Sequence, residues 1–365
     1  MSDSLGRRPV FLMTFCVYAA ASFGLALKKS SYAALAVLRG LQSIGGSAIL
    51  GLMLASTNLG PCVGPVVGSG AILASGDPLW CFWALLIFGG SSLMLIGWTL
   101  PETARTVVGN GAVPAKSAWQ AWGDILHARK KHEASNGIDG IDGGTTGKGK
   151  WVIPNPLSSV RIIFYRDTFL ILWMAASPYT VWYCIQTSIP LTFGKDIYGY
   201  NDLIVGLCFL PGGLGVILGG LIVGGLMDWN YKRTAENRIS RLYTILSVSV
   251  IALIGYGWAV ERHTHSSIPL ILQAFIGAKC TVVLQMFSAL LVDIFPEHPG
   301  TAAAANNLTR CALSAAAVAV LQPLSDALGR SWLFTMLGLL DGGLGLLAVW
   351  VLRQWGSSWR QKRDA

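Results

Sequence analysis

Long apolar stretches, each holding at most one charged residue, alternate with short polar segments along almost the whole chain. A helix needs about 20 apolar residues to cross the ~30 Å hydrocarbon core of a bilayer. Most stretches have this length, which predicts membrane-spanning helices and a polytopic all-α protein. The stretches are 10–27, 30–75, 81–100, 168–194, 203–227, 242–260, 266–292, 300–325 and 331–352.

The stretch 30–75 is too long for one crossing, because at ~1.5 Å per residue it would reach about 69 Å. We interpret it as two helices, 32–54 and 60–75, joined by a tight connector at 55–58, with Pro61 at the start of the second. Ten spans follow. With the N-terminus in the cytoplasm, 19 of the 27 lysines and arginines then lie on the cytoplasmic side. This excess is what the positive-inside rule expects.

The segment between the fourth and fifth spans is rich in glycine and charge. We therefore predict four parts: an incomplete N-terminal bundle of four spans, a flexible cytoplasmic linker, a six-helix C-terminal bundle and a basic cytoplasmic tail. Their bounds are 1–106, 107–166, 167–353 and 354–365. The linker contains Gly147 and Lys148, as a phosphate-binding loop would. The residue directly after Lys148 is neither serine nor threonine, so the sequence excludes that motif.

Composition narrows the functional class. Hydrophobic residues make up 53% of the chain and charged residues 12%, and the mean hydropathy is +0.55. Soluble domains carry about 25% charged residues, so a soluble enzyme is excluded. Most of the net charge of +9 lies between spans and so indicates topology instead of nucleic-acid binding. The seven cysteines form no CxxC pair. We expect no metal and no cofactor.

Four motifs occur in order along the N-terminal half. Asp3, Gly6, Arg7 and Arg8 precede the first span, and Arg39 and Gln42 lie early in the second. The third span opens with Gly60, Pro61, Gly64, Pro65 and Gly68, and the fourth closes with Leu-Pro-Glu-Thr-Ala-Arg at 100–105. Together they resemble the major facilitator superfamily, in particular its fungal drug:proton antiporter branch, which includes organic-acid and metabolite exporters.

The resemblance implies a major facilitator fold of twelve spans in two bundles, working by alternating access. This chain matches the fold without its first two spans, so a truncated gene model or splice form is one expectation. It also implies that the first and third motifs control conformational gating, and that Asp228 repeats the first motif in the second bundle. Ser69 stands where the family usually has the last glycine of the third motif.

Charged groups inside spans are functional candidates, because lipid disfavours them. They are Arg39, Lys279, Arg310 and Asp341. The resemblance links Arg39 to proton coupling, and Gln42 lies one turn away on the same face. Asn306 lies one turn before Arg310. Lys279 either faces a cavity or pairs with an acid, and both remain open.

A polar and aromatic stripe lies in the fifth span. Tyr179, Tyr183 and Gln186 are spaced by four and three residues, and so they share one helix face. Such a stripe either packs against neighbouring helices or lines a substrate path. We include it among the candidates for the substrate path.

We therefore predict a secondary active transporter, not an enzyme, that exports small organic molecules coupled to protons. Three basic groups against one acid inside the spans favour organic acids or acidic metabolites. The alternatives are a multidrug:proton antiporter for cationic or amphiphilic compounds and an inactive truncated fragment. We expect a monomer whose partners are its substrate, protons and the lipid bilayer. The expected location is the plasma membrane, with the vacuolar membrane as the alternative.

Overall fold

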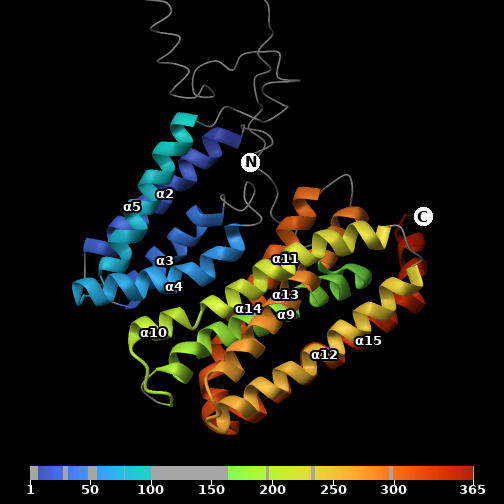
Figure 1. Ribbon diagram of the computed structural model, residues 1–365. Helices are drawn as coiled ribbons and strands as arrows, with labels where there is room; N and C mark the ends of the chain where they lie inside the picture. Colours follow the sequence, from blue (N-terminus) through green and yellow to red (C-terminus); the bar gives the residue numbers. More distant parts are fainter. Residues whose placement is uncertain are drawn as a thin grey trace, which may run out of the picture. The chain divides into compact units, whose positions relative to one another are not determined.

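The computed structural model describes residues 7–27, 32–47, 56–77, 79–99, 163–194, 197–231, 235–295 and 299–364, and these residues form helices and turns without a strand (Figure 1). The predicted all-α class is confirmed. The helices are α2 (Arg7–Leu27), α3 (Tyr32–Ser47), α4 (Ser56–Ser75), α5 (Trp80–Thr99), α9 (Arg166–Phe193), α10 (Asp202–Leu207), α11 (Leu210–Tyr231), α12 (Ala235–Glu261), α13 (Ser267–Ile294), α14 (Pro299–Leu328) and α15 (Arg330–Asp364).

Seven of the described helical segments are long and apolar enough to cross a membrane. They are Pro9–Leu27, Trp80–Thr99, Asp167–Phe193, Asp202–Val223, Ser267–Ile294, Gly300–Leu328 and Arg330–Leu352. Two shorter apolar helices, Val63–Ser75 and Leu246–Glu261, lie in other predicted spans. Residues 100–162, which contain most of the predicted linker, lie outside the described residues, as do Asp3 and Gly6.

One predicted detail is wrong. Residues 56–58 of the predicted connector are helical, because α4 already begins at Ser56 and Pro61 lies in its second turn. The short polar side chains of Ser56 and Asn58 suit a first helical turn, whose amides have no partner inside the helix. The predicted span 203–227 agrees with the apolar segment Asp202–Val223, within which α10 ends at Leu207 and α11 begins at Leu210, just before Pro211. Proline lacks the amide that would bond to the carbonyl of residue 207.

The chain divides into two compact units, 1–54 with 71–154 and 55–70 with 155–365. In the first unit α2 packs against α3 and α5. Gly24 of α2 lies against Leu38, and Gly89 of α5 lies against the ring of Tyr18. Small residues therefore permit close helix contact in this unit.

In the second unit α9 is central, because it packs against α13, α14 and α15. Its buried residues Ile171, Leu172 and Met174 form the largest apolar cluster, together with side chains of α12, α13, α14 and α15. The helices α12 and α15 lie side by side (Figure 1). The polar side chains of α9 are therefore held among three neighbouring helices.

A close backbone contact in this unit runs between α11 and α13. A Cβ on Gly215 would lie 2.6 Å from the carbonyl carbon and 2.8 Å from the Cα of Ala274. A Cβ on Gly219 would likewise lie 2.8 Å from the Cα of Ala278. Because only backbone lines this contact, no side-chain rotation can make room for a methyl group. We call Gly212, Gly215 and Gly219 of α11, with Ala274, Gly277 and Ala278 of α13, the glycine seam.

We expect Gly215→Ala to lower the free energy of unfolding by about 2 kcal/mol or more, because overpacking costs more than the improved helix propensity returns. Gly343→Ala is the matched control, since Gly343 of α15 is exposed and a Cβ there meets nothing among the described residues within 4 Å. The control should be neutral or slightly stabilising. Unfolding in detergent measures both variants. If Gly215→Ala and Gly343→Ala were equally stable, the close backbone contact at the glycine seam would be contradicted.

Candidate functional site

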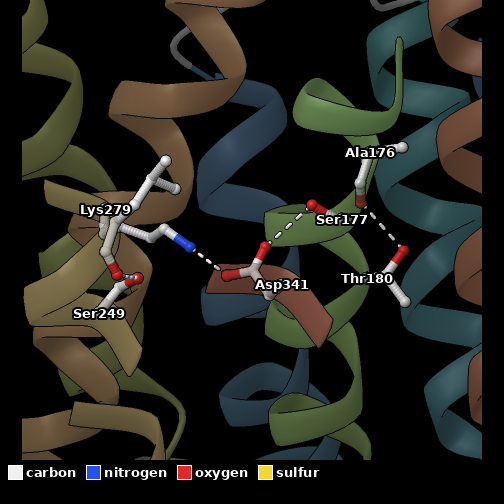
Figure 2. A network of polar contacts seen from close by, with 7 residues as sticks. Ala176, Ser177, Thr180, Ser249, Lys279 and Asp341 are labelled. Atoms are coloured by element: carbon white, nitrogen blue, oxygen red, sulfur yellow. Dashed lines mark hydrogen bonds and ion pairs between the residues drawn. The ribbon is translucent and has the colours of Figure 1, made fainter. Parts of the chain in front are cut away.

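Two buried charged residues of the second unit, Lys279 and Asp341, form an ion pair. The Nζ atom of Lys279 on α13 contacts Oδ2 of Asp341 on α15, and Oγ of Ser177 on α9 donates a hydrogen bond of 2.9 Å to Oδ1 (Figure 2). All three side chains are buried. Of the two possibilities that the sequence left open for Lys279, the structure shows pairing with an acid. The positive charge of Lys279 is therefore balanced inside the protein.

Arg310 of α14 has a different environment. Its guanidinium lies over the ring of Tyr179, 4.2 Å from the ring centroid, which is a cation–π contact. Its Nε atom is buried without a hydrogen-bond partner, and no carboxylate among the described residues forms an ion pair with it. Arg310 therefore carries a positive charge that the described part of the protein does not balance.

The polar and aromatic stripe on α9 contacts side chains of the neighbouring helices. The rings of Tyr179 and Tyr183 lie 4.6 Å apart, and both pack against the cluster around Trp182. The hydroxyl of Thr180 lies 3.2 Å from that of Ser314 on α14. This face of α9 is therefore polar and aromatic, and it borders both α13 and α14.

Two amide side chains complete the polar groups of this unit. Gln273 on α13 donates a hydrogen bond of 3.0 Å to Oε1 of Gln186, which lies at the end of the stripe. Asn306 on α14 donates a bond of 2.9 Å to the hydroxyl of Ser288 on α13. The predicted residues Gln186 and Asn306 thus each bridge two helices. Ser177, Gln273, Ser288 and Ser314 were not predicted.

In the first unit, the structure places Arg39 and Gln42 together as the spacing predicts. Nη1 of Arg39 donates to Oε1 of Gln42 at 3.1 Å, and Nε2 of Gln42 donates to the hydroxyl of Ser22 on α2 at 2.9 Å. The guanidinium of Arg39 also lies 5.0 Å from the ring centroid of Phe82 on α5. Gln42 is buried and Arg39 is exposed. Three helices meet at this group.

In the third motif, the contact that the structure describes is not made by the first two glycines. Gly60 and Gly64 are exposed, and a Cβ on either would meet nothing within 4 Å among the described residues. Instead, Pro65 and Ser69 face Gly206 of α10, where a Cβ would lie 3.0 Å from the Pro65 carbonyl oxygen and 2.9 Å from the Ser69 Cβ. The serine at position 69 therefore lies opposite a glycine on the neighbouring helix.

The other gating candidates are placed only in part. Gly68 is half-buried in α4. Arg7 and Arg8 begin α2, Pro61 lies in α4, and Asp228 lies near the end of α11. The side chains of these four residues lie outside the described part of the structure.

Comparison with known proteins gives the family. The profile of the Major Facilitator Superfamily matches residues 47–319, which is most of the chain. The chain belongs to the major facilitator superfamily. The four motifs therefore predicted the family correctly. Since this is a family of membrane transporters, the chain is an integral multi-pass membrane protein and not an enzyme.

Its relatives in this superfamily include fungal transporters. The MFS-type transporter phiD of a fungal species is 34% identical over 380 residues, which cover 93% of this chain and 57% of phiD. Citrate exporter 1 of Aspergillus niger is 30% identical over 415 residues, covering 100% of this chain and 76% of that protein. The MFS-type transporter tstD of Talaromyces stipitatus is 31% identical over 410 residues, covering 100% and 73%. The chain thus spans just over half the length of phiD.

Solved structures support the same fold. The human organic anion transporter MFSD10 is 21% identical with a TM-score of 0.54, covering 96% of this chain and 78% of that chain. A D-xylose-proton symporter is 15% identical with a TM-score of 0.60, covering 97% and 82%. At these identities the likeness establishes the major facilitator fold.

Proposed function

We propose that this chain is a secondary transporter that exports small organic acids by alternating access, coupled to protons. The observation that carries the proposal is the distribution of charge in the second unit. Lys279 is balanced by Asp341, whereas Arg310 has no acidic partner among the described residues and lies at the aromatic stripe of α9. A guanidinium in a low-dielectric environment attracts a carboxylate strongly.

The relatives support this substrate class. One of them is named as a citrate exporter, and its alignment covers the whole of this chain. Transporters with two bundles bind substrate between their structural repeats near the middle of the membrane. Arg310 lies inside the apolar segment Gly300–Leu328, away from both of its ends, as such a site would require. In this proposal Arg310 binds a carboxylate, and Tyr179 and Tyr183 line the path beside it.

A second candidate function, export of cationic amphiphilic compounds, is favoured by the aromatic rings of Tyr179, Trp182 and Tyr183, since cations bind to such rings. The contact of Arg310 with Tyr179 opposes it, because the guanidinium already occupies that ring and repels a second cation. A transport measurement separates the two functions.

Purified chain in proteoliposomes should exchange radiolabelled citrate in a counterflow assay, and a cationic dye should compete poorly. Imposing a proton gradient should change the net citrate flux, and an ionophore that collapses the gradient should remove this change. Empty liposomes and liposomes with the Arg310→Ala variant are the controls. If the dye moves while carboxylates neither move nor compete, the cationic alternative replaces the proposal.

Arg39 is proposed to couple transport to protons, as the family resemblance implies. We expect Arg39→Ala to remove the response of net flux to a proton gradient while leaving membrane insertion and counterflow exchange in place. The physical reason is that a guanidinium near a titrating group changes the proton affinity of that group. Proton-driven flux equal to that of the wild type would contradict this role.

The remaining parts of the proposal follow from the sequence. The first and third motifs, with Asp228, act in conformational gating, and Asn306 and Gln42 belong to the substrate and proton path with the charged residues. The protein acts as a monomer in the plasma membrane, with the vacuolar membrane as the alternative.

A further inference from the structure

The buried pair of Gln186 and Gln273 holds two hydrogen-bonding groups that nothing in the described structure satisfies. Gln273 is fully buried and Gln186 is 8% exposed. After their mutual hydrogen bond, Nε2 of Gln186 and Oε1 of Gln273 remain buried without a partner. Unsatisfied buried polar groups are rare, because they lose their bonds to water without replacement. A pair of them side by side calls for a ligand.

The chemistry of that ligand does not depend on how the two amides are oriented. If both side chains are rotated by half a turn, the donor and acceptor roles exchange, and the pair still forms one hydrogen bond. In either orientation one N–H group and one carbonyl oxygen remain free. The pair therefore always offers one donor and one acceptor to a third group.

A neutral group that both donates and accepts fits this arrangement. A hydroxyl or an un-ionised carboxyl group can accept from the free N–H and donate to the free oxygen. A carboxylate would be repelled by the oxygen, and an ammonium group has no lone pair for the N–H. The pair therefore discriminates by hydrogen bonding and not by charge.

The residues around Gln186 and Gln273 place this pair beside the proposed substrate path. Gly212 lies against both Gln273 and Trp182, because a Cβ there would be 2.7 Å from Nε2 of Gln273 and would also meet the indole. Gln186 lies seven residues after Tyr179 on α9, which is two turns or about 10 Å along the axis. The pair bridges α9 and α13, so separation of these two helices would open it to the path.

We infer that Gln186 and Gln273 bind a hydroxyl group of the substrate while Arg310 binds its carboxylate. This inference rests on the proposed export of organic acids and adds the specificity for hydroxylated acids. Sites that hydrogen-bond a substrate hydroxyl reject analogues that lack it, because their own polar groups are then left unpaired.

The test compares L-malate with succinate, which differ by one hydroxyl group, in counterflow with the full chain. We expect the wild type to prefer malate by about tenfold or more in kcat/KM. The double variant Gln186→Met and Gln273→Met removes both amides together. It should bring the malate-to-succinate ratio of kcat/KM to about one, because neither acid then meets the two amides.

The control variant is Gln322→Met. Gln322 of α14 is exposed and hydrogen-bonds to Asp326 at 3.0 Å, so it offers the same substitution outside the pair. It should keep the preference for malate. If the double variant does not insert, Gln186→Asn, which withdraws the amide by one methylene, should show the same loss of preference.

Three outcomes overturn the inference. They are a wild type without preference, a double variant that keeps the preference, and a variant that loses malate and succinate transport equally, which would show a structural role. If the wild type transports the cationic dye but neither acid, the result would instead refute the organic-acid proposal on which the inference rests.

Discussion

The variant Asp341→Ala should be less stable than the wild type by about 3–5 kcal/mol, because it leaves Lys279 buried and unpaired. The hydroxyl of Ser177 would lose its acceptor at the same time. The double variant Lys279→Met with Asp341→Leu removes both charges and should recover most of the loss, since a buried ion pair replaced by apolar side chains is often neutral. Unfolding in detergent, followed by intrinsic tryptophan fluorescence, measures both.

The matched control for this prediction is Asp326→Ala. Asp326 is an exposed acid of α14 that accepts a hydrogen bond from Gln322, and its removal should change stability by less than about 0.5 kcal/mol. A double variant as unstable as Asp341→Ala would contradict this account of the pair.

Arg310→Ala should raise the KM for a di- or tricarboxylate by about 30-fold or more, which corresponds to losing about 2 kcal/mol from one partner of a charge pair. Arg310→Lys keeps the charge but not the planar group that stacks on Tyr179, and so it should recover part of the affinity. Initial rates of counterflow over a range of citrate concentrations give both values.

Arg262 supplies the control for Arg310. Its guanidinium also lies over an aromatic ring, 5.4 Å from the centroid of the Trp258 ring, but it follows α12 in a turn between spans. Arg262→Ala should leave the KM unchanged. If both arginine variants behave alike, the effect at Arg310 is a general effect of losing an arginine–aromatic contact, and the proposed anion site is wrong.

The sequence predicts contacts that lie within one helix. Arg39 and Gln42, three residues apart, form a hydrogen bond, and Tyr179 and Tyr183, four residues apart, place their rings in contact. Helix geometry fixes which residues share a face, so the spacing alone is sufficient. The apolar stretches predict the helices for a similar reason, because their length matches the bilayer.

Contacts between helices could not be predicted in the same way. Lys279 and Asp341 are separated by 62 residues, and their pairing depends on how α13 and α15 rotate about their axes. Ser177 carried no signal, since serine in a helix usually bonds to its own backbone. Gln273 carried a weak one, as a glutamine in a strongly apolar stretch. The short break between α10 and α11 had a clear signal in Pro211.

The glycine seam also determines which parts of the second unit can move. Two backbones in direct contact cannot slide past one another without a clash. We therefore expect α11 and α13 to move together as one rigid body during any rearrangement that preserves the glycine seam. Bending would then be confined to the ends of this helix pair. One such end is the turn at Cys208 and Phe209, where the amide of Phe209 bonds to the carbonyl of Gly206, three residues back. We therefore expect any movement of α10, which faces Ser69, relative to the helix pair that carries Lys279 to occur at this turn.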